Sequence, residues 1–162
     1  MFDAEVEWTG NLGTGTSEYR AYDRAHTIRA VGKPPIHGSS SPGFRGDAGA
    51  YNPEELLVAA LAACHMLWYL HLCAVNGVRV VGYADRATGS MEESGADGGR
   101  FTDVVLRPRV RISAGDPERA RALHAPAHEK CYIANSVNFP VRVEPEVEVD
   151  AGSPTATGRG SP

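Results

Sequence analysis

The strongest structural signal in the chain is the segment Asn52-Pro-Glu-Glu-Leu-Leu-Val-Ala-Ala-Leu-Ala-Ala-Cys64-His-Met-Leu-Trp-Tyr-Leu-His-Leu-Cys73-Ala-Val-Asn-Gly77. Its first residues favour a helix start, because Asn52 is a good N-cap and Pro53 suits the first helical position. Two glutamates follow in the first turn, where the helix dipole favours anions. The Asn-Gly pair at the end is typical of a helix stop. The stretch therefore predicts one long helix that ends at Val75.

This helix carries no charged residue from Leu56 to Val75. A membrane span needs about 20 such residues, so the length alone would allow one. Alanines and two histidines dilute the hydrophobicity, and few basic residues flank the segment to orient a span. We interpret the segment as a core helix that is apolar all round because other elements surround it. In so short a chain, this predicts a second subunit that covers one of its faces.

Composition excludes several classes of protein. The chain has 162 residues, of which 42 % are hydrophobic and 22 % charged, as expected for one globular domain over residues 1–150. Its net charge of −4 provides no basic surface for nucleic acid. No secretory signal is recognisable and the cysteine number is odd, which indicates a cytoplasmic protein. Residues 151–162 are rich in Gly, Ser and Pro and are expected to be disordered.

The remaining elements predict an α+β fold. Extended runs at residues 4–9 and 18–31 predict a hairpin with its turn at residues 11–16, followed by a long loop over residues 32–50. Asp116 predicts the start of a second helix, which we expect to kink or break at Pro126. Further strands are expected at residues 79–83, 87–93, 101–112 and 137–149. Helices separated by antiparallel strands are not typical of a doubly wound parallel sheet.

Three cysteines are the candidates for chemistry. A thiolate is the reactive form, and a cation must stabilise it where no helix N-terminus does so. Cys64 is too far inside its helix for the dipole to help, so an arginine from the preceding loop (Arg45) or from the hairpin (Arg20 or Arg24) is needed. Cys131 is a candidate disulfide partner of Cys64. Cys73 faces another side of the helix and is interpreted as a small packing residue.

A metal site is the competing hypothesis. Cys64, His65, His128 and Cys131 supply two thiols and two imidazoles if the two helices pack together. Adjacent side chains on a helix point about 100° apart, however, so Cys64 and His65 cannot easily share one ion. We interpret His65 and His71 as core or pocket histidines, and His124 and His128 as helix-surface ones. The sequence lacks the glycine-rich nucleotide motifs and the serine-nucleophile motif.

Two blocks of sequence carry a resemblance to a known family. The first runs from Asn52 to Met66, and the second is Leu123-His-Ala-Pro-Ala-His-Glu-Lys-Cys131-Tyr-Ile-Ala-Asn-Ser-Val137. Together they resemble the osmotically inducible and organic-hydroperoxide-resistance (OsmC/Ohr) family. By the order of its elements, the resemblance covers residues 5–149. It implies an OsmC-like fold, with antiparallel sheets around two central helices, in an intertwined homodimer.

The resemblance also implies a thiol peroxidase. Cys64 would attack the peroxide and become a sulfenic acid, and Cys131 would resolve it to a disulfide. The family's glutamate falls on Glu54, which would pair with the arginine that activates the thiolate; we favour Arg45 and keep Arg20. The expected substrates are organic peroxides, with hydrogen peroxide as a further candidate. A thiol reductant is expected, which in the Ohr branch is a dihydrolipoyl protein, and neither a cofactor nor a metal.

Two features depart from the better-known members: the activating arginine and the residues after Cys64. The arginine does not transfer cleanly, because Arg45 resembles the position in the OsmC branch and Arg20 the one in the Ohr branch. His65 and the residues up to Tyr69 replace an aromatic residue followed by small ones, so the pocket has another shape. Glu54 lies ten residues before Cys64, or about 15 Å along the helix axis. We therefore expect Glu54 to serve the site of the partner subunit. The alternatives are a non-enzymatic stress-response dimer, and a metal- or ligand-binding module built on the cysteines and histidines.

Overall fold

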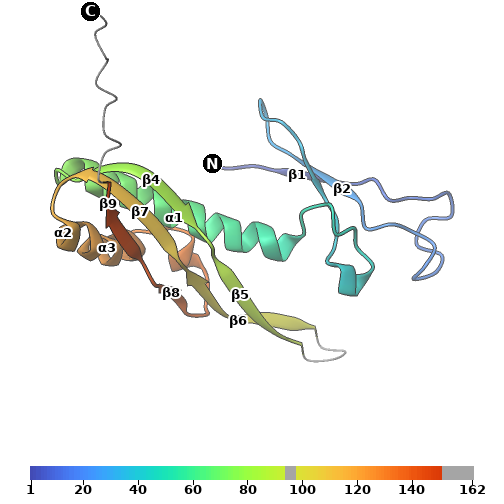
Figure 1. The fold of residues 1–162 in the computed structure, drawn as a ribbon. Coiled ribbons are helices and arrows are strands. Elements are labelled where there is room, and N and C mark those ends of the chain that lie inside the picture. The colour runs from blue at the N-terminus through green and yellow to red at the C-terminus, as the bar shows by residue number, and fades with distance from the viewer. Residues whose placement is uncertain (94–97, 151–162) are drawn as a thin grey trace, which may run out of the picture. The chain divides into compact units, whose positions relative to one another are not determined.

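The computed structural model describes residues 1–93 and 98–150, and Figure 1 shows its elements. The chain divides into two compact units, one from Met1 to Leu57 and one that begins at Val58. The expectation of a single domain over residues 1–150 stays a prediction. The expected disorder of residues 151–162 lies outside the described residues.

The first unit contains a three-stranded antiparallel sheet in the order β1-β2-β3 (Figure 1). These strands are β1 (Glu5–Trp8), β2 (His26–Arg29) and β3 (Ile36–Gly38). The predicted hairpin pairing is confirmed, since Glu5 lies opposite Arg29. Two predictions about this unit are wrong. Strand β2 is much shorter than residues 18–31, and the expected loop over residues 32–50 contains β3 and the 3₁₀ turn η1 (Pro42–Phe44).

Helix α1 (Pro53–Val75) begins and ends where the sequence predicts. Asn52 and Glu55 form a reciprocal cap: the Glu55 N–H donates to Asn52 Oδ1 at 2.8 Å, and the Asn52 N–H donates to Glu55 Oε2 at 3.3 Å. The chain then turns at Gly77, whose φ of 72° lies in the left-handed region. The boundaries of α1 were predictable because each depends on local residues.

The second unit contains two three-stranded sheets, in the orders β4-β7-β9 and β5-β6-β8. The pairs β4–β7 and β5–β6 are antiparallel, whereas β8 lies parallel to β6 and β9 lies parallel to β7. The α+β class is thus confirmed, with two parallel pairs that were not expected. The strands are β4 (Arg79–Asp85), β5 (Thr88–Glu93), β6 (Gly99–Leu106), β7 (Pro108–Ala114), β8 (Val141–Val143) and β9 (Glu146–Val149).

The predicted strand over residues 101–112 is divided between the two sheets at Arg107. Pro108 starts β7 and has no N–H for the sheet ladder, which explains an interruption here. The Arg107 N–H donates instead to Asp85 Oδ1 at 2.7 Å, across the same break in the neighbouring strand. One long hairpin is thereby shared between two sheets.

The second helical region consists of α2 (Pro117–Ala122) and α3 (His124–Glu129). Asp116 caps α2 as predicted, because its Oδ1 accepts from the Glu118 N–H at 3.0 Å. The predicted kink or break at Pro126 is wrong: the helices separate at Leu123, and Pro126 lies in the first turn of α3. The N–H groups of a first turn have no partner within the helix, so a proline there removes no hydrogen bond. A 3₁₀ turn, η3 (Ala134–Ser136), follows.

The core of the second unit lies on one stripe of α1. Its buried residues recur every fourth position, at Leu61, His65, Tyr69 and Cys73. They face β4, β7 and the α2–α3 region, and the central cluster consists of Tyr69, Cys73, Val78, Val110, Ile112, Ala120, Leu123 and Ala127. By length and composition α1 could also cross a membrane, a test that core helices of soluble proteins pass too.

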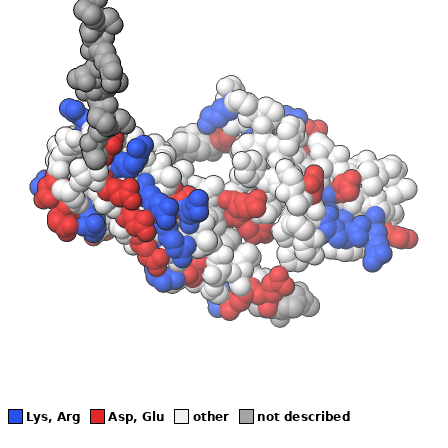
Figure 2. All heavy atoms as spheres, viewed as in Figure 1, with Lys and Arg blue, Asp and Glu red and all other residues white. Residues whose placement is uncertain are grey.

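The surface of the second unit mixes acidic and basic side chains, as the space-filling view of one face shows (Figure 2). Neighbouring strands carry opposite charges in ion pairs. Examples are Arg107–Glu144 at 3.1 Å, Arg109–Glu146 at 3.1 Å and Arg142–Asp103 at 2.8 Å. Such exposed pairs add little stability and are typical of a solvated sheet face.

Candidate functional site

Two of the three cysteines come together in the second unit. Cys64 is half-buried in the middle of α1, whereas Cys131 is buried just after α3. Burial, and then the adjoining Cys64 thiol, raise the pKa of Cys131 to about 11. The Ala134 N–H points at the Cys131 sulfur from 3.4 Å and acts in the opposite direction. Cys131 is therefore a neutral thiol at physiological pH, and the Cys64 thiol beside it is more accessible to solvent.

Cys73 is separate from this pair. It is 1 % exposed and belongs to the core cluster with Tyr69, which confirms its interpretation as a packing residue. Burial raises its pKa, and the neighbouring Tyr69 hydroxyl partly offsets the rise. A buried neutral thiol of this kind is unreactive.

A buried histidine pair lies beside the cysteines and was not predicted. His65 on α1 is 0 % exposed and His124 on α3 is 3 % exposed. A hydrogen bond of 2.9 Å joins His65 Nε2 to His124 Nδ1. The prediction that His124 lies on the helix surface is wrong, because α3 turns this residue toward α1. The core prediction for His65 is confirmed, whereas His71 is exposed.

Burial keeps both rings of this pair neutral. It lowers the pKa of His65 to about 4, with a further contribution from the charge of His128. It lowers the pKa of His124 to about 3, with a further contribution from His65. The outer nitrogens, His65 Nδ1 and His124 Nε2, are buried and have no hydrogen-bond partner among the described residues. The pair thus forms one bond and no wider network.

The metal hypothesis finds no support in this arrangement. Within residues 1–93 and 98–150, no group of three or more His, Cys, Asp or Glu side chains could hold a metal ion. The set of Cys64, His65, His128 and Cys131 is divided instead: the two thiols adjoin, and His65 is bonded to another histidine.

Arg45 lies in the first unit, on a tight loop over residues 39–47. The loop is held by the Asp47 N–H, which donates to Ser39 Oγ at 3.1 Å, and by the Gly46 N–H, which donates to the Ser41 carbonyl at 3.0 Å. Arg45 has a φ of 64°, the one positive value for a non-glycine residue in the described chain. A left-handed conformation costs a non-glycine residue about 1 kcal/mol or more and is enriched at functional sites.

The Arg45 loop borders a cavity of about 360 Å³ within the first unit. Its charged and titratable lining residues are Asp23, Arg24, His26, His37, Arg45 and Asp47. The guanidinium of Arg24 lies 4.5 Å from the ring centre of Tyr19 and 4.2 Å from that of Tyr22, so Arg24 is fixed by packing. Arg20, the other predicted arginine, is exposed and does not line this cavity. The choice between Arg45 and Arg20 as the cation for Cys64 therefore stays a prediction.

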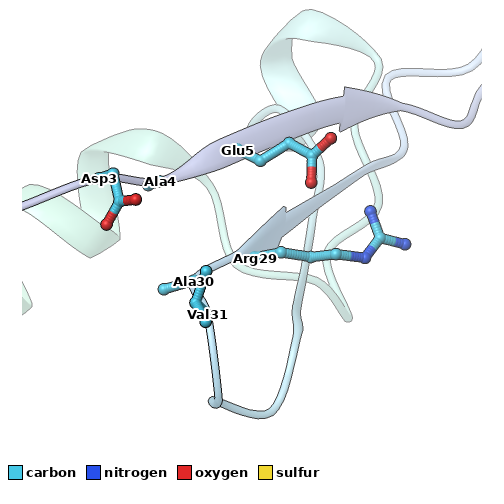
Figure 3. A pocket seen from close by; sticks show the side chains of 6 residues that line it. All are labelled: Asp3, Ala4, Glu5, Arg29, Ala30 and Val31. Atoms are coloured by element: carbon cyan, nitrogen blue, oxygen red, sulfur yellow. The ribbon is translucent and has the colours of Figure 1, made fainter.

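A second cavity of about 360 Å³ in this unit is lined by the start of β1 and the end of β2 (Figure 3). Figure 3 shows the carboxylate of Glu5 and the guanidinium of Arg29 on these neighbouring strands. The lining contains no cysteine, histidine or candidate arginine. It is not the predicted site.

Glu54 is the remaining predicted residue. Its Oε2 atom is buried and has no hydrogen-bond partner among the described residues. No ion pair joins Glu54 to Arg45 or Arg20 within residues 1–93 and 98–150. The predicted pairing of Glu54 with an arginine therefore stays a prediction. A buried carboxylate oxygen without a partner is nevertheless suited to receive a guanidinium.

Comparisons with known proteins show the family and the fold. A family model described as OsmC-like protein matches residues 46–146. An OsmC-like protein of unknown function from Vibrio cholerae is 34 % identical over 90 % of this chain and 98 % of its own, with a TM-score of 0.80. No curated protein matches the chain.

Two further solved structures share the fold at lower identity. An organic hydroperoxide resistance protein OsmC from Legionella pneumophila is 21 % identical over 92 % of this chain and 97 % of its own, with a TM-score of 0.63. An organic hydroperoxide resistance protein from Elizabethkingia anophelis is 16 % identical over 93 % of this chain and 96 % of its own, with a TM-score of 0.64.

Proposed function

Because the chain belongs to the OsmC-like family, we propose that it is a thiol-dependent peroxidase that reduces organic hydroperoxides. Structural relatives that are named organic hydroperoxide resistance proteins support a peroxidase-like role. The observation that carries the finer proposal is the adjoining pair of unequal thiols. Cys64 is partly open to solvent, whereas Cys131 is buried beside it and protonated.

The proposed cycle has two chemical steps on these sulfurs. The Cys64 thiolate attacks one oxygen of the hydroperoxide, the O–O bond breaks, and the other oxygen leaves with a proton as an alcohol. Cys64 then carries a sulfenic acid. Cys131 attacks the Cys64 sulfur, an S–S bond forms, and the hydroxyl leaves with the Cys131 proton as water. An external dithiol reduces the disulfide, which requires a reducing compartment such as the cytoplasm.

We propose that Arg45 is the cation that activates Cys64 and that Glu54 is the carboxylate that pairs with Arg45. Cys64 lies too far inside α1 for the helix dipole to stabilise a thiolate, so an external cation is needed. The left-handed backbone of Arg45, its place at the cavity, and the unpartnered Oε2 of Glu54 support this choice. We keep Arg20 as the alternative cation.

A homodimer is part of the proposal. The face of α1 opposite its buried stripe is exposed and, apart from His71, apolar or small: it consists of Ala59, Ala63, Leu67, His71 and Val75. Leu67 and Val75 are 63 % and 65 % exposed, and an apolar stripe of this kind on a helix is typical of a subunit interface. We propose that a second copy of the chain covers it and that Glu54 serves the site of that copy.

Counting free thiols before and after one equivalent of an alkyl hydroperoxide tests the proposal. A loss of two thiols per chain supports the peroxidase. An unchanged count supports the non-enzymatic dimer. Protection of the thiols by added zinc, reversed by a chelator, supports the metal-binding module.

A further inference from the structure

The two segments that carry the reactive cysteines are joined at a second point, the His65–His124 hydrogen bond of 2.9 Å. His65 follows Cys64 directly on α1, and His124 is the first residue of α3, the helix that leads to Cys131. We infer that this hydrogen bond is a latch that positions Cys131 for attack on the oxidised Cys64 sulfur. The inference rests on the proposed function, which supplies the oxidised sulfur.

The path from His124 to Cys131 is short and stiff. Within α3 the Lys130 N–H donates to the Pro126 carbonyl at 3.2 Å, and the Cys131 N–H donates to the His128 carbonyl at 3.1 Å. The Asn135 N–H then donates to the Cys131 carbonyl at 3.0 Å, which fixes the residue from its other side. A displacement of His124 from α1 is therefore transmitted to Cys131.

Tyr69 also holds the His124 ring in place. The Tyr69 ring stacks on the His124 ring with 3.8 Å between centres and 14° between planes. Tyr69 lies four residues after His65, so both contacts come from the same stripe of α1. His124 is thus bonded at its edge and packed on its face by one helix, which makes its position well defined.

The hydrogen bond between His65 and His124 couples the tautomers of the two rings, because both nitrogens belong to neutral imidazoles. If His65 donates through its Nε2–H, then His124 accepts at Nδ1 and carries its own proton on Nε2. If His124 donates through its Nδ1–H, then His65 accepts at Nε2 and carries its own proton on Nδ1. Either way, the two rings carry the same tautomer. The titratable side chains of His128 on α3 and Tyr69 on α1 lie against the pair. Tyr83 on β4 packs against Tyr69.

The latch acts on the second chemical step alone. The first step needs only Cys64, its cation and the hydroperoxide. In the second step the S–O bond of Cys64 breaks and the S–S bond forms, which requires the Cys131 sulfur in line with the leaving hydroxyl. The latch raises the effective concentration of one thiol at the other sulfur. His65 and His124 are thereby positioning residues.

Equilibration with mixtures of reduced and oxidised glutathione measures this effective concentration without any peroxide. The protein gives up two thiol hydrogens, its Cys64–Cys131 disulfide forms, and one oxidised glutathione becomes two reduced molecules. His124→Phe keeps the ring stack on Tyr69 and removes the hydrogen bond, and we expect the effective concentration to fall about tenfold or more. His124→Asn places an amide near the Nδ1 position and should restore it to within about threefold of wild type. Arg109→Gln, on the solvated sheet face, is the control and should change nothing.

An unchanged effective concentration in a folded His124→Phe variant would overturn the latch. If that variant does not fold, the long-range ¹H–¹⁵N spectrum of the wild-type histidines decides. The same tautomer in His65 and His124 supports the latch, and different tautomers contradict it. If the wild-type protein does not consume peroxide but gives the expected result in both tests, the proposed function is wrong and the latch still holds.

Discussion

The thiol of Cys131 adjoins that of Cys64, although one follows α3 and the other lies in the middle of α1. The two sulfurs have unequal environments. Cys64 is partly accessible, and Cys131 is buried with its pKa raised to about 11. This inequality predicts a fixed order of events, in which Cys64 meets the oxidant first.

Substitutions of the three cysteines should therefore have three different results. Cys64→Ser should abolish peroxide reduction, because Cys131 is protonated and shielded. Cys131→Ser should consume about one equivalent of hydroperoxide and stop as a sulfenic acid that dimedone traps. Cys73→Ser, in the core cluster away from the pair, is the control and should turn over at close to the wild-type rate. Single-turnover kinetics with mass spectrometry of the dimedone adduct measures all three, and peroxide reduction that persists in Cys64→Ser would contradict the order.

Arg45→Ala should slow the attack on hydroperoxide at neutral pH by about tenfold or more, because the thiolate loses its cation. Arg45→Lys keeps the charge but not the two-pronged geometry and should recover part of the rate. Arg20→Ala is the matched control on an exposed residue of the same unit. Stopped-flow loss of the Cys64 thiol reports the step. A slow Arg20→Ala together with a normal Arg45→Ala would move the assignment to Arg20.

The buried histidines predict a stability that depends on pH. Their folded pKa values, about 4 for His65 and about 3 for His124, lie below the ordinary value of about 6.5. The unfolded chain therefore binds protons first as the pH falls, so their contribution is complete above about pH 6.5 and is lost progressively toward pH 4. Urea unfolding at pH 7, 5.5 and 4.5 should show this loss.

Replacing the pair with Gln at position 65 and Asn at position 124 should flatten that pH dependence, because neither amide titrates. Arg109→Gln, on the solvated sheet face, is the control and should leave the slope unchanged. Equal slopes in the wild type and the double variant would show that the pair is not the source.

The exposed stripe of α1 predicts a homodimer in solution. Leu67→Glu introduces a charge at its centre, where burial against a second apolar surface would cost several kcal/mol. Light scattering at micromolar concentration should give the mass of two chains for the wild type and of one chain for this variant. Arg109→Gln, on the solvated sheet face, should stay dimeric. A wild-type protein with the mass of one chain would contradict this prediction.

The elements with local signals were predictable, and those that depend on distant contacts were not. Helix α1 has a cap, a first-turn proline and a terminal glycine within its own sequence, so its bounds followed directly. Strand β3 exists because it pairs with β2, and residues 32–50 by themselves suggest only a loop. The parallel neighbours of β6 and β7 likewise come from the far end of the chain.

The same holds for the site: the cysteines within sequence motifs were predicted, and a contact between distant segments was not. The resemblance identified Cys64 and Cys131 as a pair, and their thiols do adjoin. The bond between His65 and His124 escaped prediction because the two residues are 59 positions apart. Pro126, two residues after His124, also predicted an interruption of the helix close to His124. The available signal was the spacing of His65, Tyr69 and Cys73, which places an imidazole on the buried stripe of α1 and so requires a partner for it.

Cys64 and Cys131 are proposed to form one redox pair within a chain. Disulfide mapping by mass spectrometry, after one equivalent of an alkyl hydroperoxide and rapid alkylation, is the decisive measurement. We expect a Cys64–Cys131 disulfide within single chains, with Cys73 alkylated and two thiols lost per chain. A bridge that includes Cys73, a bridge between two chains, or three thiols still free would contradict it.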